Sequence, residues 1–462
     1  MKSIVIIFHK RLNFLILFFS FLLLNCESYV EVDLPDSHIT HEMVFNDIGT
    51  VEATLANIYS KLVNDVLVCG DTHGVSILMG SYADELKTYN TNIPEFQFYQ
   101  NSLLATNLEV VSLWNKSYNL IYAANSIIEG LENSTISNSV KNRLIGEAIF
   151  LRTFIHFYLQ NLFGEIPYVT STDYFTNGTI GKVSRTEAYT SMINDLKVVK
   201  ELMPVVNSDI YRIRASYDAV RSLLARVYLY NNEWQLAELE ADFIINSGNY
   251  EWVDSLDEVF FKGSTGTIWQ LMPIDEGLPT KEGQNFIFTN TPPLNRALSE
   301  NLLEAFEPGD MRKEKWLGSV SSESHLWYFP YKYKQNTNES VSSEYSIMIR
   351  LEELYLIRAE ARLKQGNLDG AIVDINKIRN RAGLPDVLDG NEDELMDAIL
   401  QERRIELFSE LGHRFFDLKR TGKINTVLSP LKLGWNSTDV LLPIPESELL
   451  LNPNLLPQNP GY

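Results

Sequence analysis

Three glutamates at helical spacing are the first residues in this chain whose pattern could support catalysis. Glu402, Glu406 and Glu410 recur at every fourth position, so one helix would carry them on a single face. A carboxylate pair can cleave a glycosidic bond when its members lie roughly 5–10 Å apart across a substrate cleft. A single helix face is not a cleft, and basic residues lie among these acids, namely Arg403, Arg404, Arg414 and Arg420. The pattern therefore favours structural ion pairs over hydrolysis of a glycan.

The other residue types that carry chemistry form no recognisable site in the sequence. The seven histidines make no cluster with metal-ligand spacing, since His9 lies in an apolar N-terminal leader and His38 and His41 lie in the segment after it. The sequence contains no phosphate-binding loop, nucleophile elbow or zinc-binding helix motif. We therefore predict a protein that is not an enzyme and that needs no cofactor or metal.

Aromatic rings interleaved with amides and carboxylates indicate binding instead. Between residues 67 and 103, glycines, asparagines and a proline predict a long loop, and long loops on a rigid scaffold are common binding sites. Rings in such a loop could stack on the C–H faces of sugars while polar side chains bond the hydroxyls. The candidate ligand-binding residues are Tyr82, Asp84, Tyr89, Phe96 and Tyr99. The alternative is that part of these rings packs inside the loop.

A second loop-rich stretch covers residues 263–293. It contains a short strand-like run at residues 267–271, then proline and glycine, and it offers Asn285 and Phe286 as further ligand-binding candidates. Alternating aromatics follow later in the chain, at Trp327, Phe329, Tyr331 and Tyr333. An extended segment would place these rings on one face, which we interpret as core packing rather than as a platform for sugars.

The elements that must hold these loops are mainly helical. Residues 51–63 repeat apolar side chains at helical spacing, and residues 110–131 and 141–163 are predicted to form two longer helices. Gly164 and Pro167 are expected to end the last of these helices. Strand signals collect in the two loop-rich stretches. The expected fold class is therefore mainly α.

Two short segments repeat each other at a fixed spacing. Residues 225–237 and 359–371 superpose so that Ala225 matches Ala359 and Ala237 matches Ala371. Small residues let two antiparallel helices approach closely, and a turn former separates the helices in each copy. This pattern is typical of the helix–turn–helix unit of tetratricopeptide repeats.

The N-terminal segment has the layout of an export signal followed by a lipidation site. Basic residues precede an apolar run at residues 14–24, and Cys26 comes almost directly after it. The run is too short to span a bilayer, which requires about 20 apolar residues, but it suits a signal peptide. We predict a lipoprotein signal peptide over residues 1–25, lipidation of Cys26 and a flexible tether over residues 26–46. The alternative is an uncleaved anchor helix.

Acidic residues dominate the charge of the chain. Its 462 residues carry 39 Lys and Arg against 60 Asp and Glu, and removal of the predicted signal leaves 36 against 60, a net charge of −24. This charge argues against nucleic acid as a partner. With Cys26 lipidated, Cys69 would have no internal partner, and a chain of this size buries enough apolar surface without a disulfide.

The C-terminal stretch carries the most specific pattern. Residues 441–462 read LLPIPESELLLNPNLLPQNPGY, where the prolines oppose regular elements and the leucines favour an extended strap packed on the body. This stretch resembles the C-terminal hallmark of the SusD/RagB family, the nutrient-binding outer-membrane lipoproteins of Bacteroidetes. Further resemblance comes from the predicted helix at residues 397–416 and from residues 161–164, 307–312 and 349–361.

The resemblance implies a SusD-like fold over residues 47–462, with tetratricopeptide-type helix pairs and long loop insertions. Its N-terminal part would cover about residues 47–260 and its C-terminal RagB/SusD part about residues 261–462. The resemblance also implies a lipid-anchored, surface-exposed protein of the outer membrane that acts as a lid on a SusC-like TonB-dependent transporter. Such a protein would capture an oligosaccharide, or alternatively a peptide, and pass it on. A surface glycoside hydrolase and an interaction scaffold are the other classes left open.

Overall fold

Helices make up most of the described chain, which covers residues 45–205 and 209–462 of this computed structural model. The predicted signal peptide, Cys26 and nearly all of the predicted tether lie outside the described residues. In the part that is described, no helix is long and apolar enough to cross a membrane. The long helices of the N-terminal part are α3 (Ile48–Asn64), α6 (Leu108–Glu132), α7 (Asn138–Phe163) and α9 (Arg185–Leu202).

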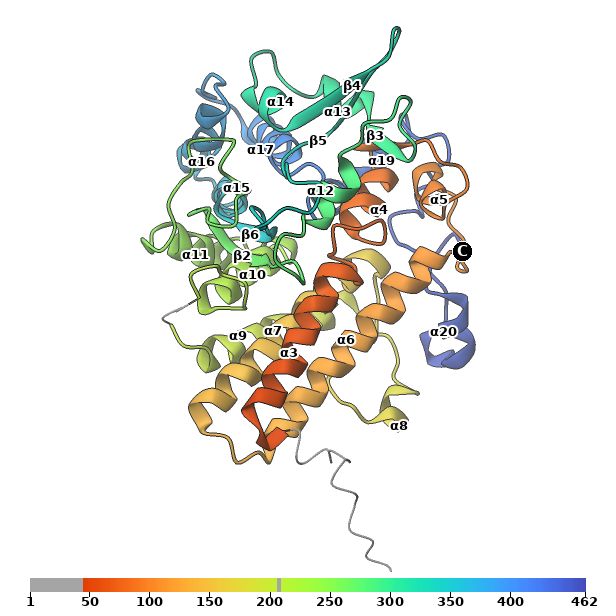
Figure 1. Ribbon diagram of the computed structural model, residues 1–462, viewed down its shortest axis with the longest axis vertical. Coiled ribbons are helices and arrows are strands. Elements are labelled where there is room, and N and C mark those ends of the chain that lie inside the picture. The colour runs from red at the N-terminus through yellow and green to blue at the C-terminus, as the bar shows by residue number, and fades with distance from the viewer. Residues whose placement is uncertain (1–44, 206–208) are drawn as a thin grey trace, which may run out of the picture. The chain divides into compact units, whose positions relative to one another are not determined.

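Side-chain caps set the N-terminal ends of α3 and α6. The helices predicted at residues 51–63, 110–131 and 141–163 are confirmed, and each begins slightly earlier than predicted. The Asp47 carboxylate accepts a hydrogen bond from the Thr50 amide at 2.8 Å, and the Asn107 side chain accepts one from the Glu109 amide at 2.9 Å. Helices α3, α6 and α7 lie side by side, and α9 packs on α7 (Figure 1). The first three together form the scaffold beneath the first insertion.

The two predicted helix–turn–helix units are confirmed. One consists of α10 (Tyr217–Tyr230) and α11 (Trp234–Ile245), and the other of α15 (Leu351–Lys364) and α16 (Leu368–Arg381). Ala225 and Ala359 are both fully buried, as the close approach of the helices requires. Helix α11 packs on α15, so the two hairpins are neighbours although 120 residues separate α10 from α15 in the chain.

The strands of the described residues form two-stranded antiparallel ribbons. Strand β2 (Thr267–Leu271), at the predicted position, pairs with β6 (Ser346–Arg350), and β4 (Leu317–Ser321) pairs with β5 (Leu326–Pro330). Strand β1 (Leu86–Thr88) pairs with β3 (Arg296–Leu298). The β1–β3 ribbon links the first loop-rich stretch to the segment that follows the second.

Two predictions about local structure are wrong. The stretch at residues 67–103 is not a long loop, because α4 (Val75–Tyr82), β1 and α5 (Glu95–Gln100) lie within it. Every residue of α4 is buried, so this helix has no polar face that a periodicity search could detect. The helix predicted at residues 397–416 is broken. Helix α17 (Glu392–Glu406) ends, a turn follows with Ser409 and Leu411 at positive φ, and α18 (His413–Arg420) begins.

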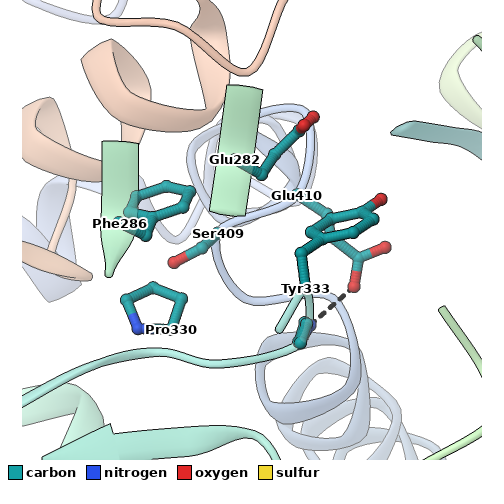
Figure 2. Close-up of a pocket in the computed structure, with 7 residues that line it drawn as sticks. Glu282, Phe286, Pro330, Tyr333, Ser409 and Glu410 are labelled. Carbon is teal, nitrogen blue, oxygen red and sulfur yellow. Dashed lines mark hydrogen bonds and ion pairs between the residues drawn. The ribbon is translucent and has the colours of Figure 1, made fainter. Parts of the chain in front are cut away.

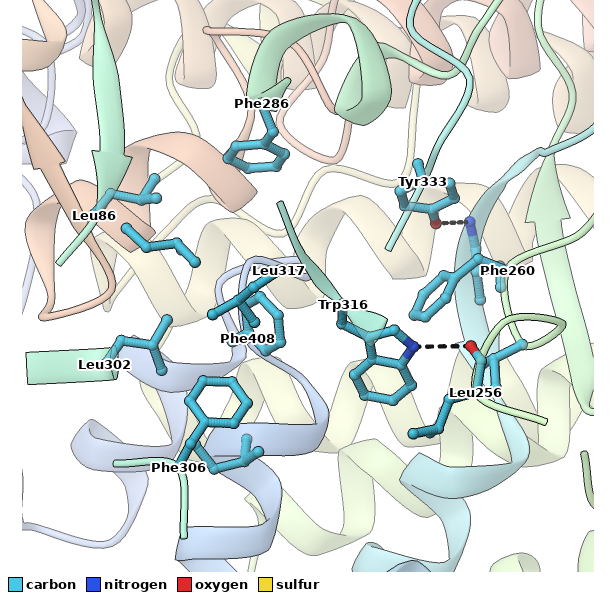
Figure 3. Close-up of a cluster of buried hydrophobic side chains, with 14 of the residues drawn as sticks. Leu86, Leu256, Phe260, Phe286, Leu302, Phe306, Trp316, Leu317, Tyr333 and Phe408 are labelled. Atoms are coloured by element: carbon cyan, nitrogen blue, oxygen red, sulfur yellow. Dashed lines mark hydrogen bonds between the residues drawn. The ribbon is translucent and has the colours of Figure 1, made fainter. Parts of the chain in front are cut away.

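A hydrophobic cluster that includes Leu317 of β4 lies in the core (Figure 3). The elements around it are α12 (Lys281–Phe286), α13 (Glu300–Glu304) and α14 (Met311–Lys315). Trp316 is fully buried in this cluster, and its indole donates a hydrogen bond of 2.9 Å to the Leu256 carbonyl. A buried indole N–H normally needs such a partner. Leu86 from β1 and Phe286 from α12 belong to the same cluster, which thereby joins both insertions to one core.

The three spaced glutamates form buried ion pairs, as predicted, but with other arginines than those nearby in sequence. Arg312 contacts Glu402 at 2.9 Å, and Arg350 contacts Glu406 at 2.6 Å and Glu410 at 2.9 Å. Burial alone would raise the pKa of Glu406, but its surrounding guanidinium groups hold that pKa well below its usual range. We call this set of ion pairs the ionic hub; it also includes Arg381 and Lys332.

The C-terminal strap packs on the body, as predicted, although it is not free of regular elements. Short helix α19 (Ile424–Leu428) precedes it, and α20 (Glu446–Leu451) and a 3-10 turn at Pro453–Leu455 lie within it. Its backbone is attached where α7 ends, because the Leu442 amide donates a hydrogen bond of 2.9 Å to the Leu162 carbonyl. The Asn459 side chain donates one of 2.7 Å to the Phe163 carbonyl. The strap thus lies against the loop that follows α7.

Candidate ligand-binding site

The two insertions meet where β1 pairs with β3. Beyond the last ribbon pair, Thr88 with Arg296, the Tyr89 amide donates a hydrogen bond of 2.7 Å to the Asn295 carbonyl. The Asn90 side chain continues the contact with a bond of 3.1 Å to the Asn295 side chain. Residues separated by about two hundred positions in sequence are therefore held at hydrogen-bond distance at the end of this ribbon.

One buried ion pair fixes the geometry of this region. Arg296 contacts Glu95 of α5 through two nitrogens, at 3.1 and 2.5 Å, and it donates a third bond of 3.2 Å to the Asn285 carbonyl at the end of α12. Two-point pairing of a guanidinium with a carboxylate sets orientation as well as distance. Thr88 and Ser81 also donate to the Glu95 carboxylate. Arg296 thus connects α5, β3 and α12 as one rigid support.

A polar pocket of about 280 Å³ opens beside this support. Its polar lining consists of Gln284, Asn285, Thr289, Asn290, Asn295, Arg296 and Asn336. Asn285 and Asn295 already bond other groups of the protein, whereas the side chains of Gln284, Asn290 and Asn336 make no hydrogen bond within the described residues. Amides offer both donors and acceptors, so free amides at a pocket can bond a ligand rich in hydroxyl groups.

Aromatic rings adjoin the pocket on the side of β5. The Phe288 ring lies 5.1 Å from the Phe329 ring, and the Trp327 ring stacks on His325 at 5.5 Å with 19° between planes. Tyr89 lies next to Trp327; partial burial raises the pKa of Tyr89, and a hydrogen bond with the Trp327 side chain opposes that rise. We call the pocket together with Tyr89, Phe288 and Trp327 the insertion site. It combines flat apolar surfaces with amides. A basic side chain is also present, since Lys87 lies over the Tyr89 ring.

The structure removes Tyr82 and Asp84 from the ligand-binding candidates. The Tyr82 side chain is 0% exposed, its ring packs on Phe98, Phe415 and Trp435, and its hydroxyl donates to the Asp439 carbonyl at 3.0 Å. The Asp84 carboxylate is also buried, where it receives two bonds of 2.8 Å from Arg414. Both residues belong to the core around α4, so the prediction that they contact a ligand is wrong.

Phe286 is likewise a core residue. It lines a cavity of only about 10 Å³, together with Pro330 and Ser409 (Figure 2). The same cavity touches Glu282, and burial raises the pKa of that carboxyl to about 7. A space of this size admits no more than a water molecule. Phe286 therefore supports the insertion site from below, and its neighbour Asn285 lines the pocket itself.

Phe96 and Tyr99 lie on α5, apart from the lining of the pocket. Both side chains are half-buried and their rings lie 6.1 Å apart, while Lys432 lies 4.4 Å from the Tyr99 ring centroid. Their role as ligand contacts remains a prediction. Of the residues predicted from the sequence, the structure brings Tyr89 and Asn285 together at the insertion site.

Sequence reasoning missed Trp327 and the asparagines Asn290, Asn295 and Asn336. The prediction that the alternating aromatics pack in the core is confirmed for Phe329 and Tyr333. The Trp327 side chain, in contrast, is partly exposed. A usable signal was the run of asparagines around Pro292 and Pro293, since prolines keep this segment out of regular elements and its amides in solvent.

Comparison with known proteins gives consistent matches along the chain. A sequence model of the SusD family matches residues 311–462, and a model described as starch-binding associating with outer membrane matches residues 29–229. SusD-like protein P2 from Formosa agariphila is 28% identical over 411 residues, covering 76% of this chain and 81% of the relative.

Solved structures share the fold. A SusD superfamily protein from Bacteroides vulgatus superposes with a TM-score of 0.79 at 22% identity, covering 90% of this chain and 100% of that protein. A laminarin-binding SusD-like protein superposes with a TM-score of 0.75 at 23% identity, again covering 90% of this chain and 100% of the other. The mainly α architecture with its helical hairpins is therefore common to these proteins.

Proposed function

The chain belongs to the SusD family, and on that premise we propose that it binds glycans at the outer membrane. It captures an oligosaccharide at the insertion site and passes it to a SusC-like TonB-dependent transporter. The observation that carries this proposal is a rigidly supported pocket lined by free amides and the partly exposed Phe288 ring, with Tyr89 bonded through its backbone to Asn295 of the lining. A laminarin-binding protein of the same fold supports a carbohydrate as ligand.

Binding at this site requires no covalent step. Sugar rings stack by their C–H faces on Tyr89, Phe288 or Trp327, while Asn290 and Asn336 bond the hydroxyls. Each stacked ring contributes on the order of 1 kcal/mol, by analogy with aromatic pairs. The support is already ordered by the Arg296–Glu95 pair, so little conformational entropy is lost when the ligand binds.

We also propose that binding is not followed by hydrolysis. The glutamates at helical spacing all take part in the buried ionic hub, and Glu402 and Glu406 are each about 1% exposed or less. A hydrolase needs two carboxylates that face the substrate, one of them able to donate a proton. Purified protein should therefore release no reducing sugar from any glycan that it binds.

The membrane role of the proposal rests on lipidated Cys26, which would hold the domain at the cell surface beside the transporter. Mass spectrometry of the mature protein extracted from membranes tests it. We expect a chain that starts at Cys26 with an attached lipid. A chain that starts at Met1 with an unmodified Cys26 would contradict the anchor.

Replacing Trp327 tests the site. Affinity electrophoresis against neutral polysaccharides, including laminarin, identifies a bound glycan, and calorimetric titration then compares Trp327→Ala with the unaltered protein. We expect affinity to fall roughly tenfold, since about 1.4 kcal/mol corresponds to a factor of ten. Tyr211→Ala is the matched control, because that ring is 42% exposed and lies outside the insertion site. Equal affinity of the Trp327→Ala protein and the unaltered protein would place the glycan elsewhere.

A further inference from the structure

A second and larger groove, of about 660 Å³, lies along the N-terminal half of α6. Its floor is α6, and its walls are the segment at residues 167–180, which includes α8 (Tyr174–Asn177), and the C-terminal strap with α20. In Figure 1, α20 and α8 both lie to the lower right of α6. We call this space the α6 groove. It shares no lining residue with the pocket of the insertion site.

The floor of the α6 groove carries aromatic rings and amides in two parallel rows. Trp114, Tyr118 and Tyr122 follow one another at every fourth residue, and Asn115 and Asn119 follow the same spacing beside them. Successive members of a row are therefore about 6 Å apart along the helix axis, four residues at 1.5 Å each. That repeat is comparable to the length of one pyranose ring. A chain of sugars laid along α6 would thus meet the Tyr118 and Tyr122 rings and the Asn115 and Asn119 amides at successive units.

Exposure increases along the aromatic row. Trp114 is 3% exposed and packs on the Tyr118 ring at 4.9 Å and on the Phe163 ring at 5.0 Å, so it forms a fixed end of the floor. Tyr122 is 52% exposed, and its ring is available to solvent. The floor of the groove is therefore rigid at its Trp114 end and open to solvent at its Tyr122 end.

Hydrogen bonds hold the walls in place. The Tyr118 hydroxyl donates to the Pro167 carbonyl at 2.8 Å, and the Asn452 side chain donates to the Ile180 carbonyl at 2.8 Å. The Asn177 side chain donates to the Ser171 carbonyl at 2.7 Å. The strap, the segment after α7 and α6 are thereby joined, and the α6 groove exists before any ligand arrives.

The polar groups of the α6 groove favour an uncharged ligand. The side chains of Asn115 and Asn119 make no hydrogen bond to any other group in residues 45–205 and 209–462, so these side-chain amides are free to bond hydroxyls. Glu448 is the charged residue of the lining, and no lysine, arginine or histidine of the described chain lines the groove. A carboxylate accepts bonds from sugar hydroxyls but repels a sulfate or a uronic acid.

We propose that the α6 groove is a second carbohydrate subsite, specific for neutral oligosaccharide chains. This inference rests on the proposed function, which it extends from one site to two. A protein partner is the other conceivable occupant. The free amides and the carboxylate favour a sugar as the occupant. In a desolvated protein interface, each of these polar groups would need a matched partner on the other protein.

With two subsites on one chain, we expect long and short ligands to bind differently. A polysaccharide that spans both sites, or that presents many equivalent units, is held by avidity, so loss of either site weakens retention well beyond the loss of one contact. A short oligosaccharide, in contrast, fills each site separately and should bind with a stoichiometry of two per chain.

The test combines Asn119→Ala with Tyr122→Ala, two substitutions at exposed positions. This groove variant, Trp327→Ala, the control Tyr211→Ala and the unaltered protein are run in gels that contain laminarin, amylopectin or the anionic polysaccharide alginate. The Tyr211 ring is 42% exposed and lines neither the groove nor the pocket. We expect the groove variant to lose roughly tenfold or more in affinity for a neutral polysaccharide, with no change for the control and no retention by alginate. Titration with a hexasaccharide of the retained glycan should show two sites, reduced to one in the groove variant.

The outcomes separate this inference from the function on which it rests. If Trp327→Ala abolishes retention and the groove variant leaves it unchanged, the proposal for the α6 groove is overturned. Glycan binding at the insertion site would then stand. Retention lost only in the groove variant supports the groove and contradicts the insertion site. Retention by alginate that depends on Tyr122 overturns the specificity for neutral chains. No retention of the unaltered protein by either neutral polysaccharide overturns both proposals.

Discussion

The ionic hub and the insertion site are both rich in polar side chains, yet they differ in how those side chains are satisfied. In the hub, Glu406 has guanidinium partners on more than one element, and burial leaves it no contact with solvent. At the insertion site, Asn290 and Asn336 have no hydrogen-bond partner among the described residues and face a pocket. The hub consists of charged side chains and the pocket is lined mainly by amides, so the two regions differ in residue type as well as in their partners. The presence or absence of a partner separates structure from binding.

Breaking the hub should give the largest effect on stability. Glu406→Ala leaves Arg312, Arg350 and Arg381 with one carboxylate fewer in a buried space, and removal of one member of a buried ion pair costs about 3–5 kcal/mol. Denaturant unfolding measures this loss. Glu314→Ala is the control, because that side chain is 79% exposed and should change stability by less than about 0.5 kcal/mol. Equal unfolding midpoints for the two variants would contradict a structural role of the hub.

Two tyrosines of the first insertion allow the same comparison between a buried and a partly exposed side chain. Tyr82→Ala should lower the free energy of unfolding by about 3–5 kcal/mol, since it opens a cavity among Phe98, Phe415 and Trp435. Tyr89→Ala should leave the thermal melt nearly unchanged and instead weaken glycan binding by about 1 kcal/mol. Thermal melts and calorimetric titrations of both variants measure the two effects. A Tyr82→Ala protein that melts normally would remove α4 from the core.

A buried acid without a basic partner in direct contact predicts a pH effect. Burial raises the pKa of Glu85 to about 8, so the folded protein holds this proton more tightly than the unfolded chain does. The resulting stability is complete below the ordinary carboxyl pKa of about 4.3. It is lost as the pH rises through about 8, with a slope of at most about 1.4 kcal/mol per pH unit.

Glu85→Gln isolates this effect, because glutamine keeps the shape of the side chain and cannot ionise. Unfolding free energies measured from pH 5 to pH 9 should converge at the acid end and diverge at the alkaline end, where the variant is the more stable protein. Parallel curves for the variant and the unaltered protein would show that Glu85 does not titrate in this range.

The smallest effects are expected from the free amides of the pocket. Asn290→Ala and Asn336→Ala should each weaken glycan binding by about 1 kcal/mol, the contribution of one net hydrogen bond, without lowering the melting temperature. Asn295→Ala is the informative comparison. Its side chain accepts a bond from Asn90 at 3.1 Å, so its loss should loosen the ribbon as well as the pocket. A melting temperature lowered equally in all three variants would mean that Asn290 and Asn336 have structural partners.

Much of the fold could be predicted because it follows from local patterns. The helices of the N-terminal part, the two helical hairpins and the strand at residues 267–271 all have a period or a turn residue that marks them. Helix α4 could not be recognised, since it is buried on every side and has no polar face. The break between α17 and α18 was hidden for a different reason. Charged residues continue across it with helical spacing because they pair with distant elements.

The candidate site was less predictable, because its members come together only through long-range pairing. Sequence alone placed Tyr89 and Asn285 in separate insertions, and the β1–β3 register joins them. Tyr82 and Tyr89 have the same side chain and lie seven positions apart in sequence. One lies in a helix that later segments cover completely, and the other lies at the open end of a ribbon. No local feature distinguishes the two.

The complete burial of α4 has a consequence for the order in which the chain is made. Asp84, just beyond this helix, finds its partners in Arg404 and Arg414, and the Tyr82 ring rests on Phe415 and Trp435, all more than 300 residues further along. During synthesis from the N-terminus, the long helices of the first half emerge and can pair while α4 still lacks its cover. For most of its synthesis the chain therefore exposes an apolar segment to water. Such a segment is prone to aggregate unless a chaperone covers it.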